Sequence, residues 1–169
     1  MAKLIKNRAL VEDTWTLLTL GEGDTADGVA LPAGDVIVPL AVWQARKAAL
    51  LASGQRIAVW LAPNEGPEAI ADDLAGLPLV AVQFPKFTDG RGYSTARLLR
   101  ERYGYQGEVR AIGDVLVDQL FFMARCGFDA FALRADKSVE SALARLDTFP
   151  EAYQTAVDRP QPLFRRRAA

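Results

Sequence analysis

Short apolar runs alternate with longer amphipathic segments from residue 56 to residue 146, and this alternation constrains the fold more than any other feature of the chain. The apolar runs are typical of strands, and the segments between them have the spacing of helices that bury one side. Strand–helix–strand order places successive strands parallel, with right-handed crossovers. We therefore expect an α/β fold with a mostly parallel sheet of alternating βα units. Strands are predicted at 56–61, 79–84, 108–112 and 128–133, and helices at 67–74, 95–103, 115–126 and 139–146.

The length of the repeat limits the shape of the sheet. About four or five βα units fit in the chain, whereas a closed barrel of eight units typically needs about 250 residues. The runs 79–84 and 128–133 are nearly all apolar, as expected of strands that are buried on both faces. An open sheet with helices on both faces is the first expectation. A half-barrel completed by a second subunit, in a homodimer, is the alternative.

The chain before this repeat has a different composition. Residues 5–10 and 14–20 are rich in β-branched and apolar residues, which predicts two strands with a turn at Glu12 and Asp13. An acidic loop is expected next, followed by a strand at 35–39 and a helix at 40–52. The predicted organisation is one domain at 1–148, with a β-rich part at 1–38 and βα repeats at 39–148, and a C-terminal extension at 149–169.

The residue types that the chain lacks limit its chemistry. The sequence has no histidine and one cysteine, Cys126, so histidine zinc or haem ligation, an internal disulfide and an iron–sulfur cluster are excluded. Residues 21–26 match G-x-G-x-x-A, but acidic neighbours and the lack of a following helix favour a turn over a dinucleotide site. We expect no metal site and no cofactor that a motif would reveal, and a flavin held without a motif stays open.

Composition and the N-terminal segment predict a protein of the cytoplasm that binds neither nucleic acid nor membrane. The formal net charge of −1 gives no electrostatic reason to expect nucleic acid or an anionic membrane as a partner. No apolar run approaches the roughly 20 residues of a membrane span. Asn7 and Arg8 interrupt the N-terminal stretch before a signal-peptide core is reached. A single cysteine suits a reducing compartment.

The polar loop 84–94 is the strongest candidate for a site, because it joins a buried strand to a helix and carries glycines. Backbone amides at the start of the helix, together with the side chains of Lys86 and Arg91, favour binding of a small anion. Asp89 and Tyr93 are the other polar candidates of the loop. Alternatively, the glycines make a tight turn and Arg91 pairs with Asp89.

Other strand-to-helix loops bring polar residues to the same place, because the carboxyl ends of parallel strands share one edge of a sheet. These residues are Asn64, Asp114, Arg134, Asp136 and Lys137. Ser94, Asp114 and Ser138 each stand where a predicted helix begins, and they are expected to be N-caps. For Asp114, a catalytic carboxylate is the alternative. Cys126 is expected to be a small core residue, with a redox or nucleophilic thiol as the alternative.

The C-terminal extension has two interpretations. It ends in Arg165, Arg166 and Arg167, and an apolar pair precedes these arginines. We expect the arginines to be solvated, and docking of residues 162–164 on a partner is left open.

Several blocks of the segment 84–131 resemble a bacterial family of uncharacterised proteins. The blocks read FPKFTDGRGYS at 84–94, LLR at 98–100, RAIGDVL at 110–116, DQL at 118–120 and RCGFDAF at 125–131. Members of that family are often labelled an oxidoreductase involved in sulfite reduction, a label connected with sulfate-assimilation genes. The resemblance implies a part in that pathway, and it implies no particular catalytic residue.

Two hypotheses of function follow from these observations. The chain has no recognisable motif for haem, siroheme, an iron–sulfur cluster or a dinucleotide, so the first is an accessory protein that binds the sulfite-reducing machinery. The second is a small enzyme or binding protein for an oxyanion or a phosphorylated metabolite, which would use Lys86, Asp89, Arg91 and Asp114.

Overall fold

The structure, a computed structural model, describes residues 3–134, 136 and 138–166. Its sheet has eight strands, which are β1 (Lys3–Lys6), β2 (Ala9–Glu12), β3 (Trp15–Leu17), β4 (Asp35–Pro39), β5 (Ile57–Leu61), β6 (Leu79–Phe84), β7 (Glu108–Gly113) and β8 (Ala130–Phe131). The α-helices are α1 (Leu40–Ala52), α2 (Arg91–Glu101), α3 (Leu120–Cys126), α4 (Val139–Leu143) and α5 (Leu163–Arg166). Three 3-10 helices accompany them, η1 (Pro67–Gly76), η2 (Val117–Gln119) and η3 (Ala144–Asp147).

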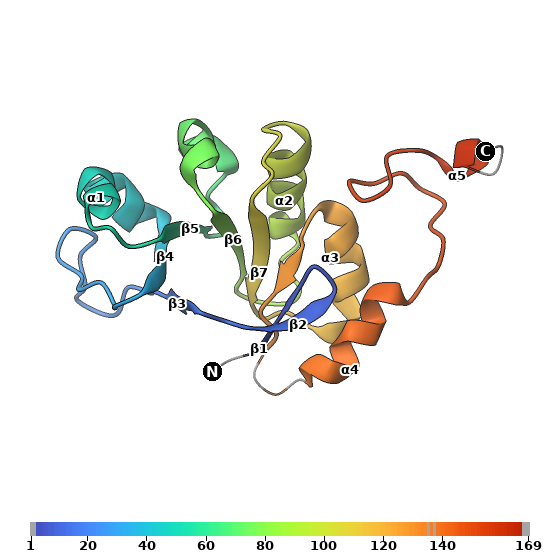
Figure 1. The fold of residues 1–169 in the computed structure, drawn as a ribbon, viewed down its shortest axis with the longest axis horizontal. Coiled ribbons are helices and arrows are strands. Elements are labelled where there is room, and N and C mark those ends of the chain that lie inside the picture. The colour runs from blue at the N-terminus through green and yellow to red at the C-terminus, as the bar shows by residue number, and fades with distance from the viewer. Residues whose placement is uncertain (1–2, 135, 137, 167–169) are drawn as a thin grey trace.

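The sheet is a curled half-barrel, in which the strands follow the order β2-β1-β8-β7-β6-β5-β4-β3 (Figure 1). Strands β3 to β8 are all parallel, whereas β1 pairs antiparallel with both β2 and β8. The α/β class is therefore confirmed, with a mixed sheet. The half-barrel shape of the alternative is the one that the structure adopts, and its completion by a second subunit stays a prediction.

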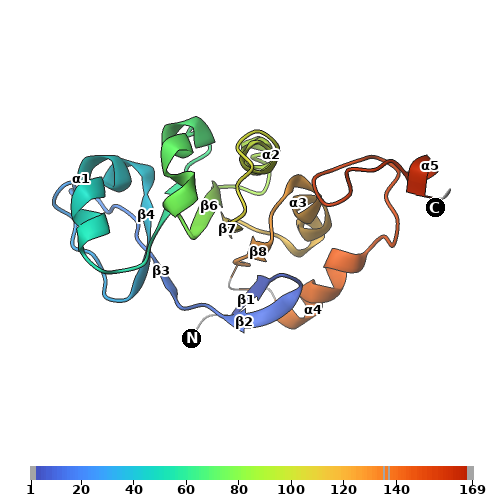
Figure 2. The same ribbon diagram turned by 45° about the horizontal axis from the view of Figure 1, so that its top comes forward.

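The expectation of helices on both faces of the sheet is wrong. From β3 to β8 each strand lies beside its predecessor in the chain, and the order never reverses. Crossovers of one hand then place every connecting helix on the same face. Helices α1, α2 and α3 accordingly lie together on the outer face of the curled sheet (Figure 2).

The main core lies between these helices and the outer face of the sheet. Alternate strand residues such as Val59, Val82 and Phe84 pack there against Leu99 and Met123, and all five are almost completely buried. The inner face carries a smaller apolar cluster, consisting of Ile37, Ala58, Leu79, Ala81 and Ile112, with Trp15 and Trp60 beside it. The near-continuous apolar runs of β5 and β6 are explained by burial on both faces.

The N-terminal region differs from the prediction. The chain turns at Asn7 and Arg8, whose φ angles are 49° and 61°, so that β1 and β2 form a hairpin with Lys3 opposite Glu12. Two consecutive positive φ angles are the requirement of a tight hairpin turn, usually met by Asn-Gly. Because Arg8 lacks the flexibility of glycine, the sequence did not signal this turn. The predicted continuous strand 5–10 and the predicted turn at Glu12 and Asp13 are wrong.

Several boundaries were predicted correctly and others were not. Strands β4 and β6 and helix α1 have the predicted bounds, and the Ser138 hydroxyl caps α4 by accepting a hydrogen bond from the Ser141 amide at 3.2 Å. Helix α2 begins at Arg91, so Ser94 lies inside it and is no N-cap. The predicted helices 67–74 and 115–126 are 3-10 in whole or in part, and the predicted strand 128–133 is reduced to β8.

The C-terminal extension is held partly by its own ion pairs. Arg166 pairs with Glu151 at 2.5 Å, whereas the ring of Phe164 is exposed. Arg167 lies outside the described residues. Within the part of the chain that the structure describes, no helix has the length and apolar character needed to cross a membrane.

Candidate functional site

Asp114 links two loops at the carboxyl edge of the parallel strands. Its Oδ2 accepts a hydrogen bond from the Phe87 amide at 2.9 Å, and its Oδ1 accepts one from Arg134 Nη1 at 2.9 Å. The residues after it form no helix until η2, where Leu116 occupies the N-cap position. The prediction that Asp114 caps a helix is therefore wrong, because both carboxylate oxygens serve the neighbouring loops.

Arg134 is held between two carboxylates. Besides its contact with Asp114, it donates to both oxygens of Asp136, at 2.6 and 2.9 Å. These hydrogen bonds, that to Asp136 first and that to Asp114 second, raise the pKa of the Arg134 guanidinium. The structure thus brings together three of the residues predicted to share this edge, namely Asp114, Arg134 and Asp136. The fourth candidate nearby, Lys137, lies outside the described residues.

Arg91 pairs with its neighbour Asp89 at the start of α2. The guanidinium donates to both carboxylate oxygens, with Nε–Oδ1 and Nη2–Oδ2 distances of 3.0 and 2.6 Å. The side-chain bond from Arg91, and then the bond from its backbone amide, lower the pKa of Asp89. The alternative interpretation of this loop, a turn closed by an Arg91–Asp89 pair, is the one seen here. Anion binding by the loop stays a prediction.

Two further candidates at this edge, Lys86 and Asn64, have side chains that make no polar contact within the described residues. Both residues are exposed. Lys86 is therefore the cation of the 84–94 loop that is not already neutralised by a neighbouring carboxylate. Its ammonium group remains available to a ligand or to a partner.

Aromatic side chains lie beside these charged loops. The ring of Tyr93 is half-buried between those of Phe84 and Phe122, with centroid distances of 5.3 and 5.2 Å. Burial is the main cause that raises the pKa of Tyr93. Phe122 is 56% exposed, and Phe87 is 51% exposed. The Gln119 side chain, one turn before Phe122, donates to the Phe87 carbonyl at 2.9 Å, so Phe87 lies beside the start of α3.

Cys126 stands on the last turn of α3 and is half-buried. Burial raises the pKa of its thiol and outweighs the opposing effect of Arg97 and Arg125. A thiol with a raised pKa is a poor nucleophile at neutral pH. Partial burial and the raised pKa of the thiol therefore favour the expected packing role over a reactive one.

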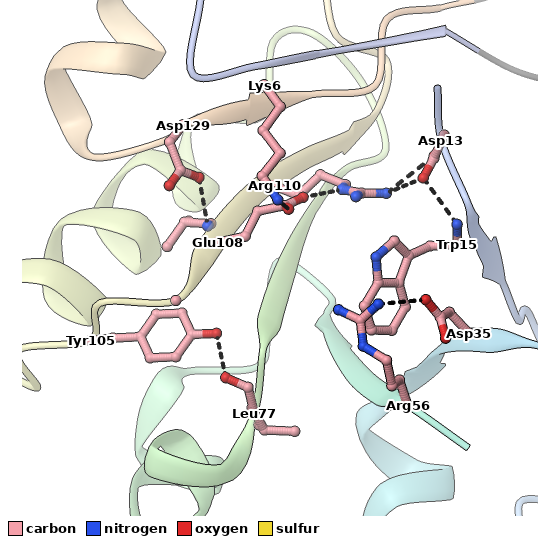
Figure 3. Close-up of polar contacts among 12 residues, drawn as sticks. Lys6, Asp13, Trp15, Asp35, Arg56, Leu77, Tyr105, Glu108, Arg110 and Asp129 are labelled. Atoms are coloured by element: carbon pink, nitrogen blue, oxygen red, sulfur yellow. Dashed lines mark hydrogen bonds and ion pairs between the residues drawn. The ribbon is translucent and has the colours of Figure 1, made fainter. Parts of the chain in front are cut away.

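Sequence reasoning missed a charged network on the inner face of the half-barrel (Figure 3). Arg110 Nε contacts Glu108 Oε1 at 2.6 Å, and Arg110 Nη1 contacts Asp13 Oδ1 at 2.9 Å. Lys6 Nζ approaches the other oxygen of Glu108 at 2.6 Å. The side chains of Arg110 and Glu108 are only 3% and 5% exposed. The available signal was their spacing of two residues, which places both on one face of a strand.

A second charged contact borders this network. Arg56 donates to Asp35 at 2.8 Å, and its guanidinium lies 4.9 Å from the ring centroid of Trp15. Trp15 follows Asp13 closely in the chain, so the segment that supplies a carboxylate to Arg110 is anchored twice (Figure 3). Among the described residues no group of three or more cysteine and acidic side chains is arranged to hold a metal ion.

The comparisons with known proteins identify a family. Residues 58–164 match a family model described as "Bacterial protein of unknown function (DUF934)". The chain belongs to this family. The match begins within β5 and ends within α5, so the family region contains the Asp114 edge, Phe122 and the Glu108–Arg110 pair, but not Lys6 or Asp13. A search of curated proteins found no match.

Proposed function

We propose that the protein is a cytoplasmic accessory protein of sulfite reduction in sulfate assimilation, and that it acts by docking a protein partner. The docking surface consists of Phe87, Tyr93 and Phe122. The resemblance of residues 84–131 to proteins labelled in this way supports the pathway. One observation supports the docking role above the others: aromatic rings are exposed at the strand edge, whereas most charged side chains there are paired with one another.

The charged groups at the strand edge are largely engaged with one another. Arg91 is neutralised by Asp89, and Arg134 by Asp114 and Asp136. Such groups hold loops in place and offer little charge to a reacting substrate. The rings of Phe87 and Phe122, in contrast, are more than half exposed. Exposed aromatic residues surrounded by polar groups are typical of the centres of protein interfaces.

Replacing both Phe87 and Phe122 by serine is expected to reduce co-purification of the partner by tenfold or more, because loss of an aromatic anchor costs about 2 kcal/mol or more of binding energy. The measurement is affinity capture of the tagged protein from a sulfate-grown native host, with quantification of the sulfite reductase subunits. Leu51→Ser is the matched control, since Leu51 is 64% exposed on α1, away from the docking surface.

The host strain supplies a second readout of the same proposal. The serine double variant should fail to restore growth of a deletion strain on sulfate as sole sulfur source, whereas the Leu51→Ser variant should restore it. Normal growth of the deletion strain, or unchanged capture of the subunits by the double variant, would contradict the proposal.

A second candidate function is the binding of a small oxyanion or phosphorylated metabolite at the 84–94 loop. The ammonium group of Lys86 favours it, because that group is exposed and has no ion-pair partner among the described residues. We expect sulfite, sulfate or phosphate to raise the melting temperature of the protein. Lys86→Ala should lower the affinity for the anion about tenfold, and so reduce this rise, by removing a charge-assisted contact. Flavin is tested in parallel. Equal shifts in the wild type, Lys86→Ala and Arg91→Ala would refute this candidate.

We also propose that two copies of the chain form a homodimer. The curled sheet ends in β3 at one side and in β2 at the other. Strands at the edge of a sheet carry unpaired backbone groups that a second chain can satisfy. A second copy at either edge would extend the half-barrel.

A further inference from the structure

A small hollow lies between α3, η3 and the C-terminal segment, which is defined here as residues 149–159. Its volume is about 290 Å³, and its lining includes Arg8, Phe121, Arg125, Phe149, Asp158 and Arg159. A volume of this order is at the lower end of the range for small-molecule sites. Phe121 lines this hollow, whereas Phe122, the next residue of α3, is exposed on the docking surface.

Arg125 has a buried donor that no group in the described part of the chain satisfies. The residue is 7% exposed, and its Nη2 donates to the Gln154 carbonyl at 2.6 Å. Its Nη1 is buried and has no hydrogen-bond partner among the described residues. Buried side-chain donors are normally paired, and an unpaired guanidinium nitrogen is costly because it carries charge. An acceptor from a bound ligand would remove this cost.

The surroundings of Arg125 select the kind of acceptor. Arg8 is already paired with Asp147, and Arg159 donates to Glu151 at 3.0 Å. The charged groups that line the hollow are three guanidinium groups and two carboxylates, those of Asp147 and Asp158, so the lining has a formal charge of +1. A single excess positive charge suits a monoanion better than a dianion such as sulfate.

Apolar groups provide room for the rest of such a ligand. The guanidinium carbon of Arg125 lies 5.9 Å from the ring centroid of Phe121, and the rings of Phe121 and Phe149 are 5.2 Å apart. A neighbouring hollow of about 340 Å³ shares Arg8, Leu146 and Asp158 with the first, and its other lining residues are Ala124, Phe128 and Phe131 together with Asn7 and Asp129. Aromatic walls beside one cationic donor fit an acid with a flat or apolar body.

We propose that this hollow is a binding site for a small organic monocarboxylate, whose carboxylate accepts a hydrogen bond from Arg125 Nη1 while its apolar body lies along Phe121 and Phe149. The site is independent of the proposed function, because it uses no residue of the docking surface. Binding here would also tie the C-terminal segment to α3, since Arg125 already holds that segment through Gln154.

The test measures binding of sodium benzoate and sodium acetate by calorimetry and by thermal shift, with sodium sulfate and sodium chloride at equal ionic strength as references. We expect benzoate to bind more tightly than acetate or sulfate, because it combines one negative charge with an aromatic body. Arg125→Lys should weaken benzoate binding about tenfold or more, since the single nitrogen of lysine cannot replace two separate donors, one on the Gln154 carbonyl and one on the ligand. Arg102→Lys, an exposed arginine outside the hollow, is the matched control.

Arg125→Lys could weaken benzoate binding simply by unfolding the hollow, so a second variant, Asp158→Asn, is expected to change the affinity in the opposite direction. Asp158 lines the hollow, and within the described residues its carboxylate makes no hydrogen bond or ion pair. Removing its charge should tighten benzoate binding about fivefold, because a repulsion at short range in a polar environment disappears. Absence of benzoate binding, tighter binding of sulfate than of benzoate, or unchanged affinity in both variants would overturn the proposal.

Discussion

Replacing Arg110 by alanine is expected to lower the free energy of unfolding by about 3–5 kcal/mol, the usual cost of breaking a buried ion pair on one side. Arg110 lies almost fully buried on the inner face and contacts both Glu108 and Asp13. Its removal leaves Glu108 with Lys6 as its ion-pair partner and deprives Asp13 of the contact that holds the segment before β3. The measurement is urea unfolding followed by circular dichroism.

Two further variants separate the charge network from general effects of losing an arginine. Arg97→Ala removes an exposed helical ion pair with Glu101, and it should cost only about 0.3–0.5 kcal/mol. Replacing Glu108 by leucine together with Arg110 by methionine should recover much of the loss, because apolar residues of similar size need no charged partner. If Arg110→Ala costs no more than Arg97→Ala, the inner network is not a stabilising element of the fold.

Replacing Gly113 by alanine is expected to cost roughly 3 kcal/mol or more, because backbone strain and a steric clash add together. Gly113 ends β7 with a φ of 95°, a conformation that residues with a Cβ rarely adopt. A Cβ built there would lie 2.4 Å from the Phe84 carbonyl oxygen, the atom that also accepts the Asp114 amide at 2.7 Å. The clash would therefore move Asp114 and loosen its bonds to the neighbouring loops.

Substitutions at two other glycines separate the cost of backbone strain from the cost of the steric clash. Gly54 has a φ of 74°, but a Cβ added there would have no neighbour within 4 Å, so Gly54→Ala should show the backbone strain alone, about 1 kcal/mol. Gly76 has neither a positive φ nor a close neighbour, and Gly76→Ala should be nearly neutral. Thermal and urea unfolding of the three variants provide the comparison. A Gly113→Ala variant as stable as Gly54→Ala would show that the chain relieves the clash easily.

Part of the candidate site could be predicted from the sequence, because parallel βα units bring their loops to one edge. That reasoning placed Asp114, Arg134 and Asp136 together, and the structure shows them in contact. It could not show which pairs would form, since each charge had several partners within reach. The exposure of the Phe87 and Phe122 rings could not be predicted either, because apolar residues in a sequence are expected to be buried.

The network around Arg110 and the unpaired donor of Arg125 show the limit of local patterns. The spacing of Glu108 and Arg110 puts them on one face, but a partner almost a hundred residues away in sequence, Asp13, is brought there by the crossing of the N-terminal segment. Arg125 has the pattern of an ordinary helical arginine until the C-terminal segment covers it and leaves Nη1 without an acceptor among the described residues.

The sequence by itself determined the α/β class, the bounds of β4, β6 and α1, and the loops where polar residues meet, because these depend on apolar periodicity and on turn residues close in the chain. The tertiary structure alone decided that the sheet curls into a half-barrel with its helices on one face. It also decided that the edge charges neutralise one another while Phe87 and Phe122 stay exposed. The physical reason is that curvature, ion-pair choice and burial depend on contacts between distant segments, and those contacts exist only once the chain has folded.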